Sequence, residues 1–95
     1  MADLLTNAKK AVMVSGDAYD TWLNSLIESA KLDLHIAGVE YAAVDDLVST
    51  AIITYVRMHF NATGAELERL QRVYEMQKAQ LMVAREYTNY GGDSE

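Results

Sequence analysis

The stretch DDLVSTAIITYVRMHF, residues 45–60, decides the fold of this chain. At 3.6 residues per turn its apolar side chains cover most of a helix circumference and leave a thin polar strip of Ser49, Thr50, Thr54 and Arg57. A surface helix usually carries one apolar stripe, whereas a helix that is apolar nearly all round is buried. A domain this small has difficulty burying one helix completely. We therefore expect this helix at the centre of a tight bundle or in a subunit interface.

Three further helices are predicted, over residues 4–12, 18–37 and 65–87. The last of them repeats apolar residues at alternating spacings of three and four, which is typical of a seam that packs on another helix. The apolar stripe of the 18–37 helix consists of Trp22, Leu23, Leu26, Ile27, Ala30, Leu34 and Ala37. The chain has no proline, which favours helices over a many-turned β fold. The predicted fold is all-α, a small bundle of about four helices with a long C-terminal helix.

Capping residues mark the ends of these helices. Ser15 or Asp17 is expected to cap the 18–37 helix, and Gly38 suits the left-handed residue that ends it. Asp45 and Asp46 place carboxylates at the start of the third helix, where the helix dipole favours negative charge. We expect residues 1–88 to form one helical domain and residues 89–95 a flexible C-terminal tail.

Composition excludes several classes of function. The net charge of −6 argues against nucleic-acid phosphate as the main binding partner, which requires a basic face. The absence of cysteine excludes disulfides and thiolate metal sites. No apolar run is long enough to span a membrane, and the N-terminus has no secretion signal, so we expect a soluble, intracellular protein.

The sequence offers little support for catalysis. His35 and His59 lie on different predicted helices, and neither belongs to a helical metal-binding pair. Asp45 and Asp46 could serve as a carboxylate pair, but helix capping explains them better. No serine lies in a nucleophile turn, and no glycine-rich phosphate loop occurs. We predict that the protein is not an enzyme and that it has no catalytic residues, cofactor or metal.

The chain resembles the head–tail connector proteins of tailed bacteriophages, also called adaptor or head-completion proteins. The resemblance covers about residues 9–87 and rests on four blocks in order: LIESAKLDLHIAGV (26–39), DDLVSTAIITYVRMHF (45–60), ERLQRVYE (68–75) and REY (85–87). The family often has proline where this chain has Asp46 and glycine where it has Asn61. Neither difference alters the helical pattern.

The resemblance implies a structural protein of the virion, at the interface between head and tail, that is assembled in the host bacterial cytoplasm. It implies a homo-oligomeric ring, commonly of twelve copies, which is consistent with the rule that a head-to-tail contact that closes generates a ring. The ring would lie under the portal protein, extend the DNA channel and offer an attachment surface to a tail-proximal connector or tail completion protein. Double-stranded DNA would pass through without specific binding, which suits the negative net charge.

Two sets of candidate residues follow from this resemblance and from the tyrosine content, since tyrosine is favoured at interfaces. The candidates for subunit or portal contacts are Ile53, Tyr55, Arg57, Phe60, Tyr74, Tyr87 and Tyr90. Tyr55 and Tyr74 are also explicable simply as core residues. The acidic candidates for the channel lining, each also explicable as a cap or a solvated charge, are Asp17, Asp20, Glu40, Asp45 and Asp46. The main alternative function is a small acidic helical regulator or binding module that acts as a monomer or dimer.

Overall fold

The computed structural model describes residues 3–40 and 44–83 of the chain. These residues form four helices and no strand: α1 (Leu4–Ala11), α2 (Asp20–Ile36), α3 (Asp46–Phe60) and α4 (Gly64–Val83). The predicted all-α fold with a long C-terminal helix is confirmed. None of these helices is both long enough and apolar enough to cross a membrane.

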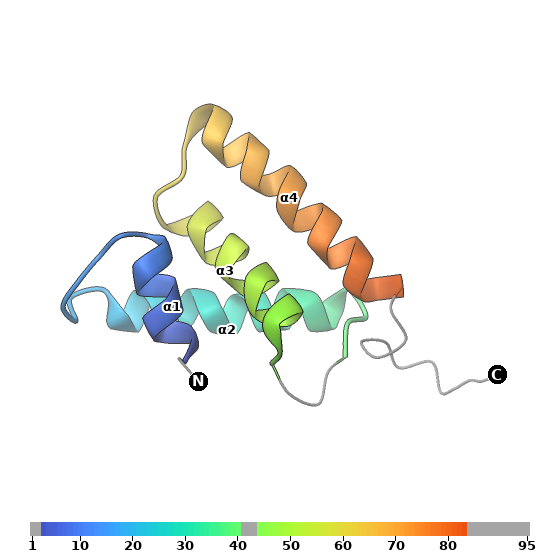
Figure 1. Ribbon diagram of the computed structural model, residues 1–95, viewed down its shortest axis with the longest axis horizontal. Coiled ribbons are helices and arrows are strands. Elements are labelled where there is room, and N and C mark those ends of the chain that lie inside the picture. The colour runs from blue at the N-terminus through green and yellow to red at the C-terminus, as the bar shows by residue number, and fades with distance from the viewer. Residues whose placement is uncertain (1–2, 41–43, 84–95) are drawn as a thin grey trace.

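Helix α3 lies at the centre of the bundle and contacts α1, α2 and α4. In Figure 1 it lies between α4 and α2, with α1 at the side. Val48, Ala51, Ile52 and Val56 are completely buried along it. Packing against three helices explains why α3 is apolar nearly all round. Of the two places expected from the sequence, the centre of the bundle and a subunit interface, α3 occupies the first.

Capping residues account for the end of α2 and the start of α3. Asp45 precedes α3 and its Oδ1 accepts a hydrogen bond from the backbone N–H of Val48 at 3.0 Å, as expected of a cap. Gly38 follows α2 with φ of +97°, which confirms the predicted left-handed residue. Backbone N–H groups of Gly38 and Val39 donate to the carbonyls of His35 and Leu34 at 3.0 and 2.9 Å, which completes a Schellman motif.

The predicted start of α2 was wrong. The helix begins at Asp20 rather than near residue 18, its N-cap is Tyr19, and no side chain caps it. Neither Ser15 nor Asp17 therefore caps it. The chain instead turns through Gly16, which has φ of +76°, and the N–H of Asp20 donates to the backbone carbonyl of Asp17 at 3.3 Å. A backbone carbonyl in this turn thus accepts a hydrogen bond from an N–H group at the start of the helix, a role that a capping side chain would otherwise have.

Helix α4 packs on α3 through the seam that its spacing predicted. Leu70, Tyr74 and Leu81 are buried, and Leu67 and Gln77 are half-buried. The expected extension of this helix to residue 87 and the expected tail over residues 89–95 lie outside the described residues. The domain boundary at residue 88 stays a prediction.

Candidate interaction surface

The contact candidates predicted on α3 lie mostly within the bundle. Ile53, Tyr55 and Phe60 are half-buried and pack against the core, and Tyr74 on α4 is only 2% exposed. Arg57 is half-buried and forms an ion pair with Glu66 at 3.2 Å. The side chains chosen from the sequence thus contribute largely to the fold, and their role in subunit contacts stays a prediction. Tyr87 and Tyr90 lie outside the described residues.

The acidic candidates occur at the two ends of α2 and at the start of α3. Asp17 and Asp20 lie at its start, where Asp20 forms an ion pair with Lys9 of α1 at 2.9 Å. Glu40, Asp45 and Asp46 lie beyond its end, before or at the start of α3. The helix between them is 17 residues long, which corresponds to about 25 Å. Asp17 and Asp20 are therefore separated from Glu40 by the length of α2.

An aromatic cluster joins the start of α2 to the end of α3. The ring centroids of Trp22 and Phe60 are 4.6 Å apart, and those of Tyr19 and Phe60 are 5.4 Å apart with an edge-on geometry. Tyr19 and Trp22 remain 46% and 45% exposed. The sequence placed Trp22 on the inward stripe of its helix, and the structure corrects this. Trp22 packs across the end of α3 and keeps one side open to solvent.

A hydrogen-bonded cluster ties α4 to α2. The Tyr74 hydroxyl donates to Asp33 Oδ2 at 2.6 Å, and the Lys78 ammonium donates to the same oxygen at 3.1 Å. Burial alone would raise the pKa of Asp33, but these two hydrogen bonds and the positive charge of Lys78 together hold the pKa below its ordinary value of 3.8. Burial first, and then the bond to Asp33, raises the pKa of the Tyr74 hydroxyl far above its ordinary range, so it stays a donor.

This cluster predicts a loss of stability in acid. Because the pKa of Asp33 is lower in the folded than in the unfolded chain, its stabilising contribution is complete above the unfolded value of 3.8 and is lost as the pH falls through the folded value. Asp33→Asn should lower the free energy of unfolding by about 1 kcal/mol at pH 7, a figure reduced for partial exposure. In acid the difference between the two proteins should shrink.

Urea unfolding at a series of pH values would measure the difference in unfolding free energy between wild type and Asp33→Asn at pH 7 and in acid. Glu68→Gln is the matched control, because it removes an exposed carboxylate that takes no part in the cluster. A gap between wild type and Asp33→Asn that stayed constant from neutral pH into acid would contradict the predicted linkage.

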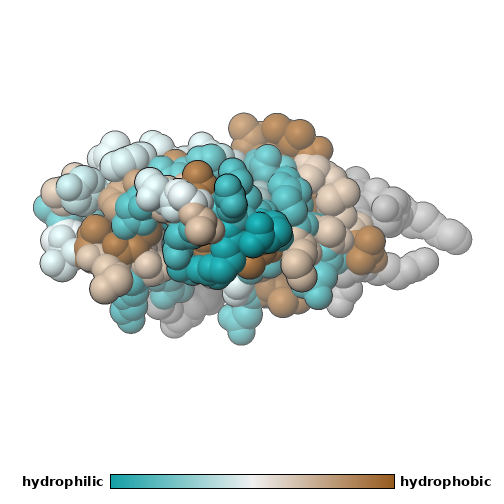
Figure 2. All heavy atoms as spheres, turned by 90° about the horizontal axis from the view of Figure 1, so that it is seen from above, coloured by the Kyte–Doolittle hydropathy of each residue, from teal (hydrophilic) through white to brown (hydrophobic). Residues whose placement is uncertain are grey.

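Exposed apolar side chains gather on the outer sides of α2 and α4, where the sequence analysis placed no candidate. Leu32 and Ile36 on α2 are 57% and 75% exposed, and Met76 and Val83 on α4 are 70% and 80% exposed. Figure 2 shows hydrophobic side chains in separate patches around a hydrophilic centre. A sequence signal for them exists, because residues spaced by three and four occur on two faces of α2, and only one of these faces was predicted to be apolar.

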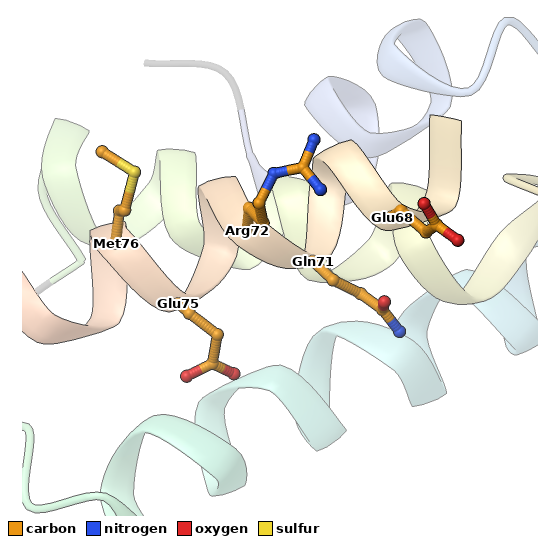
Figure 3. Close-up of a pocket in the computed structure, with 5 residues that line it drawn as sticks. All are labelled: Glu68, Gln71, Arg72, Glu75 and Met76. Carbon is orange, nitrogen blue, oxygen red and sulfur yellow. The ribbon is translucent and has the colours of Figure 1, made fainter. Parts of the chain in front are cut away.

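A shallow hollow on α4 has the character of a contact surface rather than of an enclosed site. Glu68, Gln71, Arg72, Glu75 and Met76 line it, and all five come from this single helix. Figure 3 shows Gln71 and Glu75 on the side toward α2 and Arg72 and Met76 pointing the other way. Within residues 3–40 and 44–83, no three His, Cys, Asp or Glu side chains come close enough to hold a metal ion.

The fold and these surfaces define a small helical protein whose outer faces suit contact with other proteins. The chain belongs to the phage connector protein family, since the family model of that description matches residues 4–88. The resemblance to phage connector proteins found in the sequence is confirmed by this match. No curated protein and no solved structure matched the chain. Membership in this family makes the protein a bacteriophage connector and a component of the virion.

Proposed function

We propose that the protein is a head–tail connector subunit that forms a ring under the portal and extends the DNA channel toward the tail. The observation that carries this proposal is the family match over residues 4–88, nearly the whole of the 95-residue chain. Exposed apolar side chains on α2 and α4 support it, because a small monomer gains nothing from leaving them in water. Tail-proximal connector or completion proteins would bind the opposite side of the ring.

The channel role fits the charge of the chain. A net charge of −6 repels DNA phosphates, so that DNA can slide past without being held. Among the acidic candidates, Asp20 is engaged with Lys9 and Asp45 caps α3. Asp17, Glu40 and Asp46 are exposed and are the side chains that the fold leaves best able to face DNA.

The test is the mass of the purified protein in solution, measured by native mass spectrometry alone and after mixing with the portal protein of the same phage. We expect a portal-bound ring of about a dozen copies, the closed assembly that a head-to-tail contact generates. A stable monomer or dimer that ignores the portal would contradict the proposal. That result would favour the alternative of a small helical regulator.

A further inference from the structure

The outer side of α2 carries a second helix-packing stripe, which the described part of the chain leaves open except where Trp22 packs on Phe60. Its members are spaced by three, four, three and four residues, and all are exposed: Trp22, Ser25, Ser29, Leu32 and Ile36. No charged residue belongs to it. The inward seam of the same helix is separate and consists of Leu23, Ile27, Ala30 and Leu34. We call the exposed set the α2 stripe.

The outer side of α4 carries a stripe of the same length and spacing. Its members are also all exposed or nearly so: Arg69, Arg72, Met76, Ala79 and Val83. Both stripes extend over 15 residues from first to last member, which is about 21 Å for the 14 steps of 1.5 Å between them. We call this set the α4 stripe. The inward residues of α4 that contact α3 and Asp33 lie on its other side.

We propose that the α2 stripe of one copy packs against the α4 stripe of the next copy, with the two helices parallel and in register. This inference rests on the proposed function, since it names the contact that builds the ring. In this alignment small side chains meet large ones: Ser29 faces Met76, and Leu32 faces Ala79. Ile36 faces Val83, so the apolar ends cover each other.

The charges decide the direction of the pairing. In the parallel alignment Arg69 meets the half-exposed ring of Trp22, a favourable cation–π contact, and Arg72 meets Ser25. An antiparallel alignment would place Arg72 against Leu32, which would bury a cation in apolar surroundings. It would also place Ile36 against Arg69, whose guanidinium forms an ion pair with Glu66 of its own helix at 3.3 Å. Only the parallel alignment keeps both guanidinium groups with suitable neighbours.

The occupant is a second copy because one molecule cannot pair its own stripes. Helices α2 and α4 flank the central α3, and the contact between them uses Asp33, Tyr74 and Lys78, which belong to neither stripe (Figure 1). Each copy therefore offers two different, complementary surfaces. A contact of this kind is heterologous and generates a ring when the rotation closes.

Engineered cysteines test the contact directly, because the chain has none of its own. Ser29→Cys and Met76→Cys, each on a separate copy, are mixed in the presence of portal and treated with a short thiol-to-thiol cross-linker. We expect a cross-linked dimer in the mixture but not with either variant alone, and a ladder of oligomers from the double variant. Asn24→Cys with Gln71→Cys is the matched control, since both positions are exposed but lie off the stripes.

A second variant measures the energetic importance of the contact. Leu32→Glu places a charge in the apolar half of the α2 stripe and should weaken assembly by about tenfold or more, because a buried charge without a partner is costly. Its thermal unfolding should match that of the control Asn24→Glu, since both positions are exposed in the subunit. Unchanged assembly of Leu32→Glu would overturn the inference.

The outcomes separate this inference from the proposed function. If the protein bound the portal but Ser29→Cys and Met76→Cys did not cross-link, the contact between the stripes would be overturned and the connector role would remain. Cross-linked oligomers that do not bind the portal would support the contact and remove the connector role. Cross-linking of Ser29→Cys with itself would show a symmetric α2–α2 contact and overturn the head-to-tail arrangement.

Discussion

Ile52→Ala is expected to lower the free energy of unfolding by about 3 kcal/mol. Ile52 is completely buried in the middle of α3, the helix that contacts all three others. Removing its outer carbons loses their burial and leaves a cavity between several packed helices, which cannot all move to fill it. For a domain of this size the melting temperature should fall by roughly 4–8 °C for each kcal/mol lost.

The matched control is Leu47→Ala, on the same helix but 58% exposed. Its effect should stay within about 0.5 kcal/mol, as for most surface substitutions. Urea unfolding followed by circular dichroism would measure both variants under one condition. Equal losses from Ile52→Ala and Leu47→Ala would mean that α3 is not the centre of the core.

Tyr74→Ala is expected to have an effect of similar size, about 3 kcal/mol or more, by analogy with other aromatic-to-alanine changes. The ring of Tyr74 is 2% exposed and meets the ring of Tyr55 edge-on with centroids 5.5 Å apart. The Lys78 ammonium lies 4.9 Å from its centroid, and its hydroxyl donates to Asp33. The alanine variant loses the ring packing and the hydrogen bond together.

Tyr74→Phe separates these two contributions. It keeps the ring and removes only the hydroxyl, so it should cost about 1 kcal/mol, the usual net value of one hydrogen bond. Tyr19→Ala is the control for loss of a half-exposed tyrosine ring and should cost clearly less than Tyr74→Ala. If Tyr74→Phe were as stable as wild type, the bond to Asp33 would have no role in joining α4 to α2.

Local sequence patterns predicted the helices because their causes are local. The apolar circumference of residues 45–60 predicted a buried helix, and α3 is one. Gly38 predicted the end of α2 because a left-handed residue suits glycine, and Asp45 predicted the start of α3 because its carboxylate reaches a free N–H group. The start of α2 was missed because a backbone turn replaced the side-chain cap.

The candidate surface could not be predicted in the same way. For Tyr55 and Tyr74 the sequence allowed both a contact surface and the core, and the structure buries Tyr74 and half-buries Tyr55 within the bundle. Trp22 looked like a core residue and is half-exposed. Leu32 and Ile36 lie four residues apart on one face of α2, but neither was among the predicted contact residues.

The sequence by itself determined the number, type and approximate limits of the described helices and the family, and it left α3 either at the centre of the bundle or in a subunit interface. Only the tertiary structure decided which face of α2 and of α4 is covered. The physical reason is that spacings of three and four identify residues that share a face, and α2 has two such sets, Leu23 to Leu34 and Trp22 to Ile36. Which set turns inward depends on how the helix docks on α3, and no periodicity within one helix contains that information.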